Sequence, residues 1–289
     1  MLPRLTSGQP GLMAFGQRGA RRLYLAYVGA GGAGRVAVAA SSDGKQFRTT
    51  AGPTGLTGVF GVQLAQSIAC GSLLLASAGM RLDNPLELSL STDGSRWLAP
   101  VVTGSGLEST PAVIGAIAAN AKGWSTAYLA DRPEILDQPL VASRTFNCDL
   151  SAASKEEYCF FSGGTCETFP AVGTPAWAIL GGDYVQAVAE GGGGQILQSD
   201  PHASAVPQGH ASDTGVSAAI DPKTGRGYLA WEESSGNHIS LFDNTSGAIR
   251  TCNEYTFSPP AITFFKGLLW IAWRGGPDNR INVASLKPF

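Results

Sequence analysis

Short runs of apolar residues, separated by polar and glycine-rich stretches, recur along the whole chain. Six of these runs have an alanine at the third of four positions, and they occupy residues 24–27, 74–77, 125–128, 185–188, 228–231 and 270–273. The alanines lie 50, 51, 60, 43 and 42 residues apart, which is the length of four short strands with their turns. Amphipathic runs of helical period are missing from the sequence. The pattern therefore predicts an all-β fold of six repeats.

Each repeat is expected to form four antiparallel strands, named A to D in chain order. A proline followed by a small residue opens an apolar run at positions 10, 111, 175 and 260, and proline at the first residue of a strand costs no ladder hydrogen bond. This run is strand A, whose glycine and alanine content predicts an innermost, crowded position. The alanine segment is strand B, and alternating runs such as 35–39 and 280–284 are strand C.

The last repeat stops after its strand C at residue 289, whereas residues 1–9 precede the first strand A. We expect these N-terminal residues to pair with the last repeat, because joining the two ends of the chain removes an open sheet edge. The prediction is one domain over residues 1–289. It is an all-β, six-bladed β-propeller of four-stranded antiparallel blades, closed by its N-terminal residues.

Composition agrees with a turn-rich single domain and excludes some partners. Hydrophobic residues make up 44% of the chain and charged residues 15%, with 38 glycines and 17 prolines. The net charge of −2 lacks the basic excess that nucleic-acid binding requires. We expect no membrane segment, because no run of eighteen apolar residues occurs, and no retained signal peptide. The compartment stays open, since a mature secreted form is compatible with this sequence.

The cysteines and the common catalytic motifs indicate neither a metal nor a cofactor. The five cysteines are Cys70, Cys148, Cys159, Cys166 and Cys252. Their spacing matches no zinc pattern, so the first interpretation is buried apolar thiols. A local disulfide, Cys148 to Cys159 or Cys159 to Cys166, is the alternative in an oxidising compartment. No nucleotide loop or metalloprotease motif occurs, and the glycine run 191–194 opens no helix.

Two turns in the first half of the chain carry a family resemblance. Residues 41–47 read Ser-Ser-Asp-Gly-Lys-Gln-Phe and residues 91–97 read Ser-Thr-Asp-Gly-Ser-Arg-Trp. They resemble the Asp-box, or BNR, turns of sialidase-like six-bladed propellers, although here Asp and Gly are adjacent and the later repeats lack the motif. Asp-Gly is a strong hairpin signal because glycine accepts positive φ. We expect a structural role for Asp43 and Asp93, on the face opposite the B to C loops.

The resemblance implies a sialidase-type site, with three arginines holding a carboxylate, a tyrosine activated by a glutamate, and an aspartate as acid and base. The sequence lacks the family's Arg-Ile-Pro or Arg-Leu-Pro motif. Arg81, Arg132 and Arg274 do fall in expected B to C loops, where solvated arginines paired with a neighbouring carboxylate are the simpler interpretation. Acids for general glycoside hydrolysis are available in Glu190, Glu232 and Glu233.

A ligand is expected on the face where the B to C loops open, because loops on a rigid scaffold carry binding. Tryptophans end strand B beside charged residues in the last two repeats, and an aromatic face next to planar hydrogen-bonding groups suits a sugar ring. The alternative is that both tryptophans fill the space between blades. The candidate site comprises Arg81, Asp131, Arg132, Glu190, Trp231, Glu232, Trp273 and Arg274.

The function predicted from these features is non-catalytic binding of a glycan, or another small polar ligand, by a lectin-like propeller. Two alternatives stay open beside it. One is a glycoside hydrolase related to sialidases with a rearranged site, and the other is a scaffold that binds a protein partner on the same face.

Overall fold

The protein is built from strands and turns. In the computed structural model the described residues are 8–16, 20–29, 34–58, 61–78, 86–102, 110–119, 123–131, 140–154, 171–180, 183–190, 194–199, 206–207, 209–276 and 278–288. They contain no helix, and hence none long and apolar enough to cross a membrane. The predicted all-β class is confirmed for this part of the chain.

The strands form six antiparallel sheets that follow one another along the sequence. Sheet one contains β1 (Gly11–Phe15), β2 (Arg22–Val28), β3 (Val36–Ser41) and β4 (Arg48–Thr50). Sheet two contains β5 (Val62–Ser67), β6 (Ser72–Ala78), β7 (Leu86–Ser91) and β8 (Val101–Val102). Sheet three contains β9 (Thr110–Ala119), β10 (Gly123–Asp131) and β11 (Leu140–Asn147).

The second half of the chain repeats this order. Sheet four contains β12 (Ala171–Leu180), β13 (Asp183–Glu190) and β14 (Ile196–Ser199). Sheet five contains β15 (Val216–Ile220), β16 (Gly227–Glu232), β17 (His238–Asp243) and β18 (Ile249–Tyr255). Sheet six contains β19 (Ala261–Phe265), β20 (Leu268–Arg274) and β21 (Ile281–Leu286).

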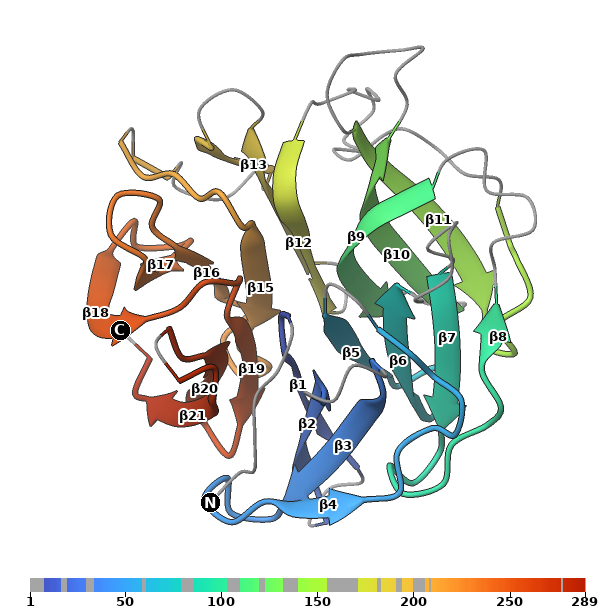
Figure 1. The fold of residues 1–289 in the computed structure, drawn as a ribbon. Helices are drawn as coiled ribbons and strands as arrows, with labels where there is room; N and C mark the ends of the chain where they lie inside the picture. Colours follow the sequence, from blue (N-terminus) through green and yellow to red (C-terminus); the bar gives the residue numbers. More distant parts are fainter. Residues whose placement is uncertain are drawn as a thin grey trace.

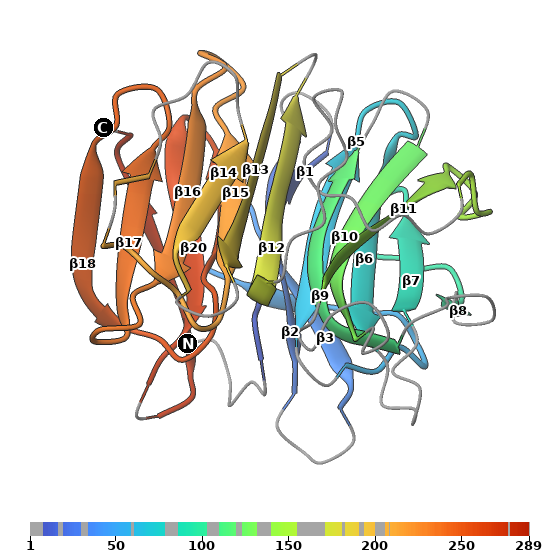
Figure 2. The same cartoon turned by 90° about the horizontal axis from the view of Figure 1, so that it is seen from above.

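The sheets stand around a common centre, with the first strand of each sheet innermost (Figure 1). Each first strand packs against the first strands of the sheets before and after it, and β19 packs against β1. Figure 2 shows the sheets side by side with their strands aligned along a common axis, so corresponding ends of equivalent strands lie at the same face. The inner position predicted for strand A is the one observed.

The repeated alanines are explained by this packing. All six alanines, at positions 26, 76, 127, 187, 230 and 272, are fully buried at 0% exposure. Most of them pair with a small residue on the first strand of the sheet, as Ala26 does with Gly11 and Ala272 with Ala261. Interiors are packed to crystal density, so only small side chains fit where neighbouring sheets converge.

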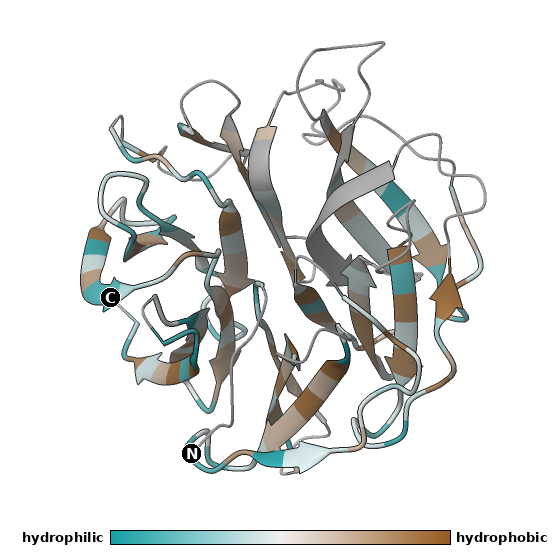
Figure 3. Cartoon of the chain, in the orientation of Figure 1, coloured by the Kyte–Doolittle hydropathy of each residue, from teal (hydrophilic) through white to brown (hydrophobic). Residues whose placement is uncertain are grey.

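Apolar clusters fill the space between neighbouring sheets. Sheets one and two share one cluster, which includes Val28 and Leu73, and sheets six and one share another, which includes Leu12 and Trp270. Figure 3 shows both hydrophilic and hydrophobic positions on the outer strand β18, in line with its mostly exposed pattern. Hydrophobic burial between sheets is thus the main source of stability.

The N-terminal closure predicted from the sequence is only partly within the described residues. Residues 1–7 lie outside them. Gln9 forms a parallel bridge with Gly61, and its carbonyl accepts a hydrogen bond from the Val62 amide at 3.0 Å. Gln9 therefore lies beside β5 and belongs to no outer strand of the last sheet.

The two Asp-Gly turns have the structural role expected of them. Asp43 Oδ1 accepts hydrogen bonds from the backbone amides of Lys45 and Gln46 at 2.8 and 2.9 Å, and Asp93 does the same in its turn. These amide contacts lower the pKa of Asp43 and of Asp93 to about 2, because they favour the charged carboxylate. The partly buried Phe47 and Trp97 pack against the clusters between sheets.

The glycines of these turns contact the preceding sheet. A Cβ on Gly44, which has a φ of +79°, would lie 2.0 Å from Cη2 of Trp270. A Cβ on Gly94, at +72°, would lie 2.3 Å from Cε1 of Tyr24. The aromatic ring at the start of the alanine segment thus rests on the turn of the following sheet, and glycine meets both the backbone and the space requirement.

We predict that Gly44→Ala lowers the free energy of unfolding by roughly 2 to 3 kcal/mol more than Gly55→Ala. Gly55 has a similar φ of +87° but nothing within 4 Å of an added Cβ, so it reports the backbone cost alone. Urea denaturation of both variants measures the difference. Equal losses would contradict a packing role for Gly44.

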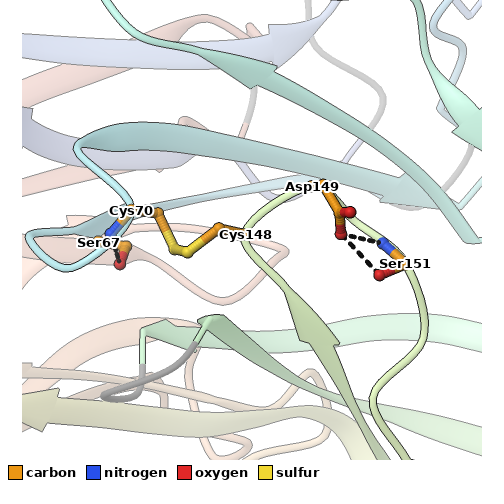
Figure 4. Close-up of a disulfide and its surroundings, with 5 residues drawn as sticks. All are labelled: Ser67, Cys70, Cys148, Asp149 and Ser151. Atoms are coloured by element: carbon orange, nitrogen blue, oxygen red, sulfur yellow. Dashed lines mark hydrogen bonds between the residues drawn. A yellow bond between two sulfur atoms is a disulfide. The ribbon is translucent and has the colours of Figure 1, made fainter.

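A disulfide joins sheets two and three, contrary to the sequence-based expectation for the cysteines. Cys70, in the turn between β5 and β6, is bonded to Cys148, which follows β11 (Figure 4). The Cys70 amide donates to the Ser67 hydroxyl at 3.0 Å, and Cys70 packs against the cluster that contains Trp124. The predicted pairing of Cys148 with Cys159 is therefore wrong, because Cys148 is bonded to a cysteine that is distant in sequence. Cys159 and Cys166 lie outside the described residues.

We predict that the double variant Cys70→Ala/Cys148→Ala loses about 4 kcal/mol of unfolding free energy, because the bond closes a long loop in the unfolded chain. The separation is 78 residues. Cys252→Ala, which removes a free, half-buried thiol, is the control. Chemical denaturation with and without a reductant gives the measurement, and insensitivity of the wild-type protein to the reductant would contradict the prediction.

Candidate functional site

Four predicted site residues end the second strands of consecutive sheets. Asp131 ends β10, Glu190 ends β13, Glu232 ends β16 and Arg274 ends β20. Because corresponding strand ends lie at one face, the backbone places three acids and one base at equivalent positions around it. We call this face, with the loops that follow these strands, the loop face. The side chains of Asp131 and Glu190, and all of Arg81 and Arg132, lie outside the described residues.

The two tryptophans of the predicted site have a packing role instead. Trp231 is 0% exposed and Trp273 is 6% exposed. Trp231 belongs to the cluster between sheets four and five, and Trp273 belongs to the cluster between sheets five and six. The expectation that these rings stack on a sugar is corrected, because their faces are covered by neighbouring strands.

Glu232 holds its carboxylate just below the loop face. The residue is 2% exposed. Its Oε1 accepts a hydrogen bond from Asn237 Nδ2 at 2.6 Å, and its Oε2 accepts one from the Thr214 hydroxyl at 3.1 Å. Burial raises the pKa of Glu232, and these two hydrogen bonds offset part of the effect.

Asn237 is held in place by the loop between β16 and β17. Its φ of 57° is left-handed, a conformation that asparagine tolerates better than most residues. The backbone amide of Asn237 donates to the Glu233 carbonyl at 2.8 Å, and the backbone carbonyl of Asn237 accepts from the Thr256 amide at 2.9 Å. The loop therefore positions the side-chain amide of Asn237 on Glu232.

A second polar pair lies next to Glu232. His210 Nδ1 and Glu233 Oε1 are 2.7 Å apart, and the two side chains are 29% and 12% exposed. The His210 ring meets the Trp231 ring edge to face at 5.8 Å. The buried tryptophan thus orients a histidine that is accessible from the loop face.

Arg274 is fixed by its own loop. Its Nε donates to Asn279 Oδ1 at 2.7 Å, and one terminal nitrogen donates to the same oxygen. The Gly275 amide closes the loop by donating to the Arg280 carbonyl at 2.7 Å. A guanidinium held by an amide oxygen keeps its full charge and its remaining donors.

Two aromatic residues at this face were missed by the sequence analysis. Tyr255 and Phe257 are 51% and 52% exposed, at and just after the end of β18. The centres of the Tyr255 and His238 rings lie 4.4 Å apart. Thr256, which lies between Tyr255 and Phe257 in the sequence, forms a backbone bridge with Gly275. Their segment therefore runs between the loops that carry Glu232 and Arg274. The signal available was two aromatics two residues apart, at and just after the end of a largely polar outer strand.

The described residues hold no cluster of three or more histidine, cysteine, aspartate or glutamate side chains that suits a metal ion. The polar groups at the loop face are carboxylates, amides, an imidazole and a guanidinium. Together with exposed aromatic rings, they form a surface suited to hydrogen-bonding ligands with apolar patches.

Comparison with known proteins gives a likeness in structure only. No protein-family model matches the sequence, and no curated protein is similar to it in sequence. An α-L-arabinanase of Penicillium chrysogenum complexed with arabinobiose has a TM-score of 0.65 at 17% identity, over 99% of this chain and 94% of that one. The fucose-specific lectin from Aleuria aurantia has a TM-score of 0.66 at 11% identity, over 98% of this chain and 93% of that one.

The fold is that of a β-propeller. A Trypanosoma rangeli sialidase in complex with the inhibitor DANA also matches, with a TM-score of 0.61 at 11% identity, over 96% of this chain and 54% of that one. At these identities the likeness concerns the fold, so no binding residue is carried over to the propeller. The likeness to sialidases in the Asp-Gly turns stays a resemblance.

We predict that wild-type protein gains stability relative to Glu232→Gln as the pH falls from about 7 towards 5. A carboxyl group whose folded pKa is raised binds its proton more readily in the folded state, so stability is lost as the pH rises through the folded pKa. The wild-type protein therefore carries a cost at neutral pH that glutamine lacks. Unfolding free energies at several pH values measure this.

Glu233→Gln is the matched control for this prediction, because it removes the neighbouring carboxylate, which is more exposed. A difference between wild type and Glu232→Gln that stays constant with pH would contradict the prediction.

Proposed function

We propose that this chain is a closed six-bladed propeller that binds carbohydrate, without catalysis, at the loop face. Support for six blades comes from the six sheets and from the packing of each first strand on its neighbours, β19 on β1 included. The apolar cluster that joins Leu12 of sheet one to Phe265 and Trp270 of sheet six supports closure by packing. The pairing of the N-terminal residues with the last blade is part of this proposal.

The observation that carries the proposal is the surface between sheets five and six. Tyr255 and Phe257 expose aromatic rings, and Thr256 between these two residues forms a backbone bridge with Gly275, which follows Arg274 with its fixed guanidinium. Sugars present apolar C–H patches next to hydroxyl groups, and aromatic rings with planar hydrogen-bond partners match both. Structural neighbours that bind arabinobiose or are specific for fucose make saccharides the first ligands to test.

We predict that the protein binds one or more glycans on an array and that Tyr255→Ala or Phe257→Ala weakens this binding at least tenfold, or about 1.4 kcal/mol. Ile68→Ala is the matched control, because Ile68 is 81% exposed and lies in the turn between β5 and β6, at the opposite end of the strands. Titration calorimetry with the best array ligand gives the affinities.

Two results would contradict the carbohydrate proposal. An array without any bound glycan would remove simple lectin function and favour a protein partner. Equal affinities for wild type and both aromatic variants would place the site elsewhere on the propeller.

A glycoside hydrolase is the second candidate, and the acidic strand ends favour it. Asp131, Glu190 and Glu232 occupy equivalent positions in three consecutive sheets, and glycoside hydrolysis uses two carboxyl groups facing the same sugar. Burial raises the pKa of Glu232, as a general acid requires.

For the hydrolase we expect release of reducing sugar from arabinan or aryl glycosides, and a loss of about 100-fold or more in kcat for Glu232→Gln. Glu233→Gln is the control, because the wild-type Glu233 carboxylate is already paired with His210. Substrate binding without turnover would support the lectin-like function, and turnover unaffected by Glu232→Gln would exclude Glu232 as the acid.

A further inference from the structure

A hollow lies at the end of sheet one that is opposite the loop face. It measures about 300 Å³, and its lining includes Arg22, Ala40, Asp43, Gln46, Arg48 and Thr50. Arg22 begins β2, Arg48 begins β4, and the Asp-Gly turn between β3 and β4 forms the remaining wall. This site is therefore separate from the surface around Glu232 and Arg274.

Sheet five shows what the same position holds in another repeat. Tyr24 of sheet one and Tyr228 of sheet five begin equivalent alanine segments, so Arg22 and Arg226, each two residues earlier, are equivalent. In the strand register Tyr228 pairs with Asp243. The guanidinium of Arg226 donates to the Asp243 carboxylate, which is fully buried.

Sheet one lacks that carboxylate. Tyr24 pairs with Ala40, so a methyl group stands where sheet five has the acidic side chain. Arg48 in turn pairs with Ala40, which brings a second arginine to the same place. The hollow in sheet one thus lies where sheet five has the side chain of Asp243, and Arg22 and Arg48 line it.

The charges in the hollow are not neutralised from within. Within the described part of the chain, neither Arg22 nor Arg48 forms an ion pair. The one acid in the lining, Asp43, uses Oδ1 for the amides of its own turn. Two cations against one anion, in a protein of net charge −2, make a locally positive site.

We propose that this hollow binds a carboxylate group, held between Arg22 and Arg48 where sheet five holds the side chain of Asp243. Planar guanidinium groups match carboxylate oxygens in pairs. The hydroxyl of Thr50 and the amide of Gln46 line the rest of the hollow, so the ligand class is a hydroxylated acid such as a uronic acid unit of a glycan. A simple carboxylate has the same anchoring chemistry without the ring.

The test is titration calorimetry with glucuronate, acetate and glucose at low ionic strength. We expect glucuronate to bind with a dissociation constant on the order of 1 mM, glucose not to bind, and salt to weaken the interaction. Binding of acetate as well would show that the carboxylate alone suffices, whereas binding of glucuronate only would show that the sugar ring contributes.

Three variants connect the binding to the hollow. Arg22→Gln and Arg48→Gln, both at exposed residues, are expected to weaken glucuronate binding at least tenfold. Ala40→Asp is expected to abolish it, because the new carboxylate pairs with Arg22 as Asp243 pairs with Arg226; Ala40→Asn is its neutral control. Arg96→Gln, in the corresponding turn of sheet two, leaves the binding unchanged.

The proposal is overturned if glucuronate does not bind, or if Arg22→Gln and Arg48→Gln bind it as the wild type does. It does not rest on carbohydrate binding at the loop face. Tyr255→Ala is expected to leave glucuronate binding intact, so failure of one site is distinguishable from failure of the other.

Discussion

The structure depends on the close approach of neighbouring sheets around the centre of the propeller. Six fully buried alanines mark the place where second strands pack without room for larger side chains. Two residues before the alanine on the same strands, Trp270 and Tyr24 rest on the turn glycines Gly44 and Gly94 of the following sheet. Adding a single methyl group at these contacts forces a clash, so van der Waals packing restricts the angle between sheets, and at Gly94 the hydrogen bond from the Tyr24 hydroxyl to the Asp93 carbonyl adds to it.

This packing holds the strand ends fixed and leaves the loops to carry the chemistry. Glu232 is buried at the end of β16 because Trp231 before it is anchored in the core, and the loop that follows supplies Asn237 as its hydrogen-bond partner. Arg274 depends in the same way on Trp273 and on Asn279. The tryptophans therefore act on the loop face by positioning the charged residue beside them.

The repeat pattern was enough to predict six sheets, the order of their first three strands and the inner position of strand A, because a two-residue period and a recurring small residue reflect backbone geometry directly. The predicted fourth strand is seen only in sheets one, two and five of the described residues. Contacts between repeats were not predictable in this way. Cys70 and Cys148 are 78 residues apart, and only the angle between sheets two and three brings them together. The exposure of Tyr255 and the burial of Trp231 likewise depend on neighbouring sheets, which local sequence does not describe.

The central claim is that the fixed ends of β16 and β20, with the segment 255–257 between them, form a saccharide-binding surface. Mapping of backbone amide chemical shifts during titration with arabinobiose and with fucose tests it most directly. The account predicts shifts concentrated in residues 233–238, 255–257 and 274–280, with little change in the turns 41–47 and 91–97. Saturable binding with shifts confined to other residues, or no shifts with either sugar or with any glycan found on the array, would contradict it.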